Sequence, residues 1–313
     1  MNRRRQQRGV ALIMAIIVVA LATIAATAIA YTSALNARRA AGIYTLEQAT
    51  RVAEGAEAMA GYALREDGKA NHFDSLTDGW AQPYGPVEIE SGVTLEASLE
   101  DLQGRFNLNN LVDANGVADP LSREIFDRLL TLLGMETRWS GVITDWIDAD
   151  SQPSFPDGAE DAEYASQSPP YRAPNMPITS VAELLALPGF GRQNYEKLRP
   201  YIAALPPGQA INHCTAPGAV LDALLGGKQE YSQNEALLVE KRKAGCFPLR
   251  ADLQSAMTPQ QWTRVERRVA DRSEFFRLRT VVSIGTTQFT LYSLMNRDQG
   301  GQIRTVLRTF GTE

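Results

Sequence analysis

Apolar residues follow three successive patterns along the chain. From Val10 to Tyr31 the sequence is almost continuously apolar. A helix of about 20 such residues crosses the roughly 30 Å hydrocarbon core of a membrane. From 36 to 65 apolar residues recur every three or four positions, which predicts one face of a helix. We therefore expect one long helix from Val10 to Arg65, whose first part is a transmembrane segment and whose second part packs against an exported domain.

Runs of β-forming residues, separated by turn residues such as Ser91-Gly92 and Gly285, predict β-strands in the remaining chain. The predicted strands are 87–90, 93–99, 275–284, 288–295 and 303–310. Between the second and third of them, helix signals occur instead, such as Asp119 before Pro120 and Ser180 three residues before Glu183. The pattern predicts an α+β fold in which a long N-terminal helix packs on one antiparallel sheet, with a large helical insertion from 108 to 272.

Positive charge before the apolar segment predicts its orientation. Four arginines lie there, namely Arg3, Arg4, Arg5 and Arg8. Basic residues stay on the cytoplasmic side, so the rest of the chain is expected to be exported. Ala28-Ile29-Ala30 resembles a signal-peptidase site, but the apolar run is about twice the usual 7–15 residues of a secretory signal. We expect a single-pass membrane protein.

Composition indicates a globular exported part. The chain has 313 residues, of which 44% are hydrophobic, and a net charge of −5 that disfavours a nucleic-acid partner. Cys214 and Cys246 would lie in an oxidising compartment, where a disulfide closing a loop of about 30 residues stabilises by roughly 3 kcal/mol. Two unbonded, buried cysteines are the alternative.

The acidic segment from Asp145 to Glu163 carries the strongest chemical signal. It holds seven carboxylates in 19 residues and no lysine or arginine. Carboxylates this close need compensating charge, which Ca²⁺ supplies through oxygen ligands. The candidate ligands for one or two ions are Asp148, Asp150, Asp157, Glu160 and Asp161. Asp145 is a weaker candidate because it can cap the preceding helix. The spacing is not that of an EF-hand, and a solvated acidic loop is the alternative.

Other motifs carry less weight. Leu187 to Gly191 resembles the hairpin of helix-hairpin-helix modules, which bind DNA phosphates, but its surroundings are acidic. His72 and His213 are isolated, which disfavours zinc and catalysis. The sequence contains no G-x-S-x-G motif or phosphate-binding lysine loop. We expect the protein not to be an enzyme.

The junction between the basic leader and the apolar segment resembles the class III signal of type IV pilins and type II secretion pseudopilins. This resemblance implies that a prepilin peptidase cleaves between Gly9 and Val10 and methylates the new N-terminus. Most pilins carry a glutamate at the fifth mature position, which neutralises the N-terminal amine of the subunit added before. Here that position is Met14. The lack of a charge at this position resembles the minor pseudopilin K family, whose members are added first. A plain membrane anchor is the alternative.

The segment from Trp146 to Asn175 is also similar to the most characteristic part of pseudopilin K. The resemblance implies a pilin-like fold with a SAM-like insertion, calcium bound with Asn175 as an additional ligand, and an inner-membrane protein with a periplasmic C-terminal domain. It implies partnership with minor pseudopilins I, J and H at the tip of the secretion pseudopilus, where the head can contact secreted substrates. A minor pilin of a type IV pilus or a membrane-anchored DNA receptor is the second hypothesis. The expected domains are 1–9 (leader), 10–31 (transmembrane helix), 32–107 (pilin-like helix and first strands), 108–272 (insertion) and 273–313 (last strands).

Overall fold

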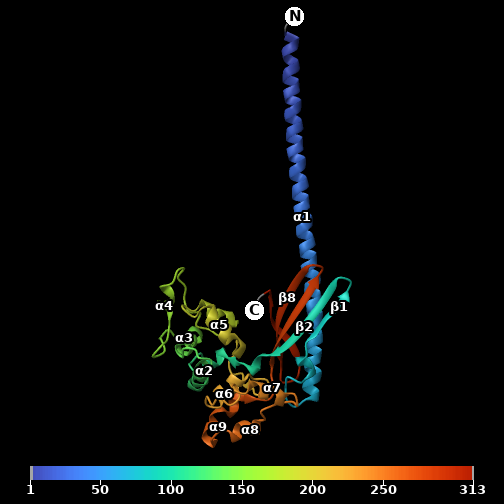
Figure 1. Cartoon of the computed structure of the whole chain (residues 1–313). Helices are drawn as coiled ribbons and strands as arrows, with labels where there is room; N and C mark the ends of the chain where they lie inside the picture. Colours follow the sequence, from blue (N-terminus) through green and yellow to red (C-terminus); the bar gives the residue numbers. More distant parts are fainter. Residues whose placement is uncertain (1–2, 312–313) are drawn as a thin grey trace. The chain divides into compact units, whose positions relative to one another are not determined.

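The computed structural model describes residues 3–311, and its described side chains begin at Val10 (Figure 1). Residues 1 and 2 of the expected leader lie outside the described residues. The chain divides into two compact units, Met1–Val52 and Ala53–Glu313. Helix α1, Arg3–Ala70, contributes to both units, because it continues without a break from the apolar segment into the second unit.

The first unit contains the apolar part of α1. An 18-residue window of this helix has a mean hydropathy of 2.8, none of it is buried, and the helix is long enough to cross a membrane. Thr23 and Thr27 donate their hydroxyl hydrogen bonds to carbonyls four residues earlier, at 2.8 Å. These bonds satisfy polar groups that could find no water in lipid. The predicted continuous helix is confirmed, and it ends five residues beyond the expected Arg65.

The second unit is built on one five-stranded antiparallel sheet. Its strands are β1 (Tyr84–Glu90), β2 (Val93–Asp101), β7 (Phe275–Ile284), β8 (Thr287–Arg297) and β9 (Ile303–Phe310), in the spatial order β1-β2-β7-β8-β9. Every neighbouring pair is antiparallel, with Val93 opposite Ile284 at one end of the β2–β7 pair. The prediction that five segments form a single antiparallel sheet is confirmed.

The last turns of α1 pack on this sheet. Leu64 of α1 belongs to a buried cluster with Phe276, Leu278 and Met295. Glu57 is also buried, and it accepts hydrogen bonds from Arg308 Nε at 2.8 Å and from the Ser293 hydroxyl. The ion pair with Arg308 ties the helix to β9, and the hydrogen bond from Ser293 ties it to β8.

The chain between β2 and β7 is mostly helical, as expected. Its α-helices are α2 (Pro120–Leu132), α3 (Arg138–Ile147), α4 (Asp161–Ala165), α5 (Gly191–Leu198), α6 (Gly218–Leu224), α7 (Glu235–Arg242), α8 (Arg250–Ser255) and α9 (Pro259–Val265). The chain also forms the 3₁₀ helices η1 (Gly79–Ala81), η2 (Leu102–Gly104), η3 (Leu108–Leu111), η4 (Val181–Ala186), η5 (Arg199–Tyr201) and η6 (Glu266–Arg268). Two parallel pairs of short strands, β3 (Phe106–Asn107) with β4 (Ile202–Ala203) and β5 (Ile211–Asn212) with β6 (Val269–Ala270), were not expected from the pattern.

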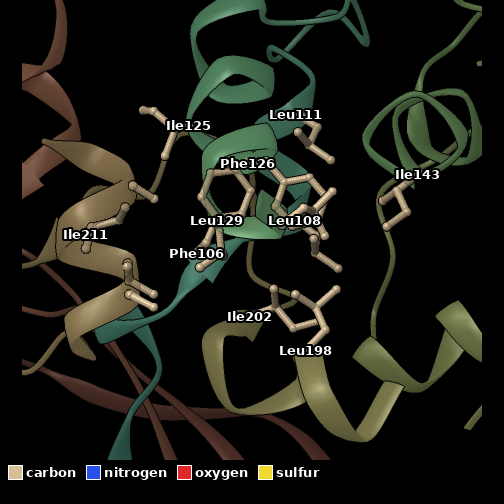
Figure 2. Close-up of a cluster of buried hydrophobic side chains, with 14 of the residues drawn as sticks. Phe106, Leu108, Leu111, Ile125, Phe126, Leu129, Ile143, Leu198, Ile202 and Ile211 are labelled. Carbon is tan, nitrogen blue, oxygen red and sulfur yellow. The ribbon is translucent and has the colours of Figure 1, made fainter. Parts of the chain in front are cut away.

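A second hydrophobic core holds the insertion together. Figure 2 shows Phe126 and Leu129 of α2 beside Phe106 and Leu108, and the rings of Phe106 and Phe126 stack with centroids 5.1 Å apart. The insertion and the sheet belong to the same compact unit. The limits 108 and 272 therefore mark an insertion in the sequence, and as domain boundaries they stay predictions.

A disulfide joins Cys214 and Cys246, whose Cα atoms lie 4.5 Å apart. Cys214 follows β5, and Cys246 lies between α7 and α8. The expected bond is confirmed.

Candidate metal centre

The C-terminal end of α3 positions the first carboxylates of the candidate metal centre. Residues 139–147 of this helix are all buried. Asp148 is the residue that ends it, and its backbone N–H donates to the Thr144 carbonyl at 2.9 Å. A helix C-terminus carries partial negative charge on its free carbonyls, which favours a cation there.

Three carboxylates converge beyond this helix end. Asp148, Asp150 and Glu160 each offer an oxygen, and these oxygens lie within 4.8 Å of one another. Asp148 and Glu160 are only 4% and 5% exposed. Asp148 Oδ1 and both carboxylate oxygens of Glu160 are buried without a hydrogen-bond partner among the described residues. Buried, unpaired carboxylate oxygens cost several kcal/mol, so the donor set fits a hard divalent cation that takes oxygen ligands.

Burial and mutual repulsion raise the pKa values of these carboxyl groups. Burial, with added repulsion from Asp145 and Asp150, raises the pKa of Asp148 to about 7. Burial and the charges of Asp145 and Asp148 raise the pKa of Glu160 to about 7. A bound divalent cation would lower the pKa of both groups, because its positive charge favours the ionised carboxylates.

Asp145, the weaker candidate of the acidic segment, lies close to the three convergent carboxylates. Its side chain is fully buried inside α3, and it does not cap that helix. Its Oδ2 accepts a hydrogen bond from Ser154 N at 2.9 Å, while its Oδ1 has no partner in the described chain. Asp145 lies outside the group of oxygens within 4.8 Å, but its charge acts on Asp148 and Glu160, and its bond to Ser154 links the helix to the loop at 149–160.

Asn175 reaches the site from a distant segment. Its φ of 48° is the left-handed conformation, which Asn tolerates better than most residues. Its Nδ2 donates to the Asp150 carbonyl at 2.6 Å, and its Oδ1 is buried without a partner among the described residues. An amide oxygen held in this way is a suitable calcium ligand.

Asp157 and Asp161 are placed differently from the other candidates. Asp157 is exposed. Asp161 is the first residue of α4, and its Oδ1 accepts a hydrogen bond from Ala173 N at 3.1 Å. The structure does not bring either carboxylate into the group of oxygens within 4.8 Å.

Two glycines give the site its close packing, a role the sequence analysis missed. A Cβ atom at Gly158 would clash with Asp145 Oδ2 and with the backbone of Ser154. One at Gly141 would lie 3.3 Å from the Asp157 carbonyl. The loop can approach α3 because Gly158 lacks a side chain, and the absence of one at Gly141 leaves the Asp157 backbone room for this contact.

Three aromatic side chains, those of Trp146, Tyr164 and Tyr171, pack against one another next to the carboxylates. The ring of Trp146 lies 5.0 Å from that of Tyr164, which lies 5.5 Å from that of Tyr171. Trp146 Nε1 and the Tyr164 hydroxyl are buried without hydrogen-bond partners in the described part of the chain. Trp146 is therefore a natural fluorescence reporter for this site.

Two other groups of potential ligands occur among the described residues, and in each of them at least one member already has a partner within the chain. Cys214 and Cys246 lie near His213, but their sulfurs form the disulfide. Asp74, the central member of a cluster with Asp67 and Asp78, pairs with the Arg297 guanidinium.

The turn that resembles a helix-hairpin-helix is present in the structure. Gly189 and Gly191 have φ values of 77° and 67°, and α5 begins at Gly191. This conformation explains why glycine occupies both positions, but it does not by itself indicate DNA binding.

The fold and the acidic site together define a class of protein, a membrane-anchored pilin-like protein with a helical, acidic insertion. A family model described as type II secretion system (T2SS), protein K, matches residues 104–207. The chain is 34% identical to type II secretion system protein K of Pseudomonas aeruginosa, over 98% of this chain and 94% of that protein. It is 32% identical to the Klebsiella pneumoniae protein of the same name, over 99% and 98% of the two chains. The chain belongs to the type II secretion system protein K family.

A solved structure has the same fold. A chain of the GspK-GspI-GspJ complex from the type 2 secretion system of enterotoxigenic Escherichia coli matches with a TM-score of 0.74 and 24% identity, covering 88% of this chain and all of that one. Family membership makes this protein a minor pseudopilin of type II secretion, and its N-terminal apolar helix fits a single-pass membrane anchor. The hypotheses of a type IV minor pilin or a DNA receptor are not favoured.

Proposed function

We propose that this minor pseudopilin forms the tip of the pseudopilus, where it initiates assembly with minor pseudopilins I and J and is then joined by H. The observation that carries the proposal is Met14 at the fifth position of the expected mature chain. A carboxylate inside the membrane costs several kcal/mol unless a partner compensates it. A first subunit has no preceding N-terminal amine as partner, so an apolar side chain is the favourable choice. The solved GspK-GspI-GspJ complex is consistent with this partnership.

Maturation and location follow from the same proposal. Prepilin peptidase cleaves between Gly9 and Val10 and methylates Val10. The helix then stays in the inner membrane, and the C-terminal domain lies in the periplasm, as the arginines before the apolar segment support. The protein acts by assembly, with no catalytic step, and supports export of folded proteins across the outer membrane.

Ca²⁺ completes the head in this proposal. Asp148, Asp150 and Glu160 would hold the ion, with Asn175 Oδ1 and Asp145 beside them. The ion supplies positive charge and a fixed oxygen coordination, which ties the end of α3 to the loop at 149–160 and to the segment around Asn175. We expect Asp157 and Asp161 to matter less for this first ion, and they remain candidates for a second.

Co-purification from membranes tests the assembly role. The full chain, tagged at its C-terminus, is expressed with prepilin peptidase and pseudopilins I, J and H, then extracted in mild detergent. We expect the unchanged chain and the control Met14→Leu to co-purify the same amounts of I and J. Met14→Glu should reduce the yield of the complex, since it places an uncompensated carboxylate in the membrane. Failure of I and J to co-purify with the unchanged chain would contradict the proposal.

A further inference from the structure

Three apolar side chains project into solvent beside the candidate metal centre. Phe155 is 93% exposed, Val117 is 61% exposed and Met176 is 58% exposed. They are the three most exposed large hydrophobic residues of the described chain beyond α1. Scattered exposed apolar residues are common and need no explanation, but exposed residues that gather in one place often mark an interaction site.

All three are attached to the same few residues at the end of α3. Each follows directly after a residue that hydrogen bonds to a residue between 145 and 150. The bonds run from Ala149 N to the Gly116 carbonyl (3.0 Å), from Ser154 N to Asp145 Oδ2 (2.9 Å) and from Asn175 Nδ2 to the Asp150 carbonyl (2.6 Å). Three separate loops therefore each carry one exposed apolar residue directly after a residue that is bonded to the segment 145–150. We call Val117, Phe155 and Met176 the apolar rim.

The position of Phe155 within the apolar rim depends on the carboxylate of Asp145, which accepts a hydrogen bond from Ser154 N. Ser154 and Asn175 each use a contact to the site to hold the neighbouring apolar residue, and the partner of Ser154 is itself a buried carboxylate. Mutual repulsion among Asp145, Asp148 and Glu160 works against this arrangement. A cation that compensates the charges would hold all three loops together.

Charge around the apolar rim selects the kind of partner. The segment 145–163 carries seven carboxylates and no basic residue, so one or two bound Ca²⁺ ions still leave five or three negative charges. Such a surface repels anionic phospholipid headgroups and attracts lysine and arginine. A large apolar anchor within a polar border is the arrangement of a protein-binding hot spot, which fills a pocket on the partner.

We propose that the apolar rim docks into an apolar pocket on a folded protein partner, that lysine or arginine residues border this pocket, and that the cation at the metal centre holds Phe155 in the docking position. The inference rests on the proposed calcium site and extends the proposed function, because it assigns the acidic insertion a role in recognition. The side chain of Phe155 is the anchor, and the surrounding carboxylates pair with the basic border.

Export measurements in cells test the docking. The full chain replaces its own copy in a strain with a complete secretion system, and the secreted fraction of a reporter exoprotein is measured. We expect Phe155→Ser combined with Met176→Ser to reduce export at least tenfold. Phe155→Leu with Met176→Leu keeps the apolar character and should export normally. Leu237→Ser is the control, because Leu237 of α7 is an apolar residue that is 53% exposed, close to the 58% of Met176.

Each outcome of that experiment has a separate meaning. Normal export by the serine variant overturns the proposal. Loss of export by the leucine variant as well would show that the positions act through folding, which also overturns it. Co-purification with I and J is measured for every variant. If the unchanged chain does not co-purify with them, the assembly function fails, whereas the docking proposal is decided by the export results alone.

Photo-crosslinking identifies the occupant and tests the role of the cation. A benzophenone amino acid is incorporated at position 155 of the full chain, and cells are irradiated with calcium or with EGTA in the medium. We expect a discrete protein adduct in cells that are exporting the reporter, reduced at least tenfold by EGTA. An adduct with lipid and none with protein would identify a membrane as the occupant and overturn the proposal. A protein adduct of equal yield in EGTA would overturn the role of the cation.

Discussion

Replacement of Glu160 by glutamine should have opposite effects on stability with and without calcium. Glu160 is 5% exposed, and neither carboxylate oxygen has a hydrogen-bond partner among the described residues. Without a cation the ionised side chain opposes folding, because burial raises its pKa from 4.5 to about 7. At pH 8 a shift of about 2.5 units corresponds to roughly 3 kcal/mol, and screening by nearby water reduces this to about 1–2 kcal/mol. Glu160→Gln should therefore stabilise the calcium-free protein by about that amount.

Calcium should reverse this order. Extracellular calcium sites have dissociation constants of about 10⁻⁴–10⁻³ M. Ten millimolar calcium then lies about 10 to 100 times above the dissociation constant, which stabilises the native state by about 1.4–2.7 kcal/mol. For a unit of this size each kcal/mol raises Tm by about 2–4 °C. The unchanged chain should gain about 3–10 °C, and Glu160→Gln should gain less than about 1 °C.

Thermal unfolding monitored by tryptophan fluorescence measures both effects. The full chain in detergent is heated at pH 8 in EDTA and in 10 mM calcium. Glu163→Gln is the matched control, since Glu163 is an exposed carboxylate of the same acidic segment and lies outside the group of convergent oxygens. It should respond to calcium like the unchanged chain. An equal calcium-induced shift in Glu160→Gln, or no shift in the unchanged chain, would refute the reasoning.

Three further changes test other parts of the fold. Burial, aided by nearby carboxylates, raises the pKa of Asp67 from 3.8 to about 6. The ionisation of Asp67 should therefore lower the free energy of unfolding as the pH rises from about 4 to about 6. Urea titrations at several pH values should show this decline in the unchanged chain and not in Asp67→Asn, and an equal decline in both would contradict the role of Asp67. Glu57→Gln leaves Arg308 without its charge partner and should destabilise by about 1–3 kcal/mol, measured by urea unfolding; an unchanged midpoint would contradict the importance of this ion pair. Reduction of the Cys214–Cys246 bond should cost about 3 kcal/mol, and Cys214→Ser with Cys246→Ser should lose the same amount and no longer respond to reductant.

Much of the fold follows from periodicity that is visible in the sequence. The helix α1 and the five strands of the main sheet each contain enough residues to show their period, so their existence and order could be predicted. Strands such as β3 and β4 have two residues each, which is too short for any alternation. Their pairing depends on the core around Phe106 and Ile202, which is formed by residues far apart in the sequence.

The convergence of carboxylates at the candidate metal centre could be predicted as a region but not in detail. Density of carboxylates identified the segment, yet local spacing does not show which side chains turn inward. Asp157 is exposed, in a loop that a hydrogen bond from Gly158 N to the Ser154 carbonyl closes at 2.6 Å. Asp145 turns toward that same loop, although its sequence position suggests a helix cap. Which side chains turn inward depends on tertiary contacts, and the periodicity of the sequence does not show these contacts.

Mass analysis of the mature N-terminus tests the central claim most directly. The full chain is expressed with prepilin peptidase, extracted from the membrane, and examined by intact mass and N-terminal sequencing. An N-terminus at methylated Val10 is the result that the pseudopilin account predicts. A chain that begins near Tyr31 would indicate a secretory signal peptide, and an intact Met1 would indicate a plain anchor; either result would contradict the account.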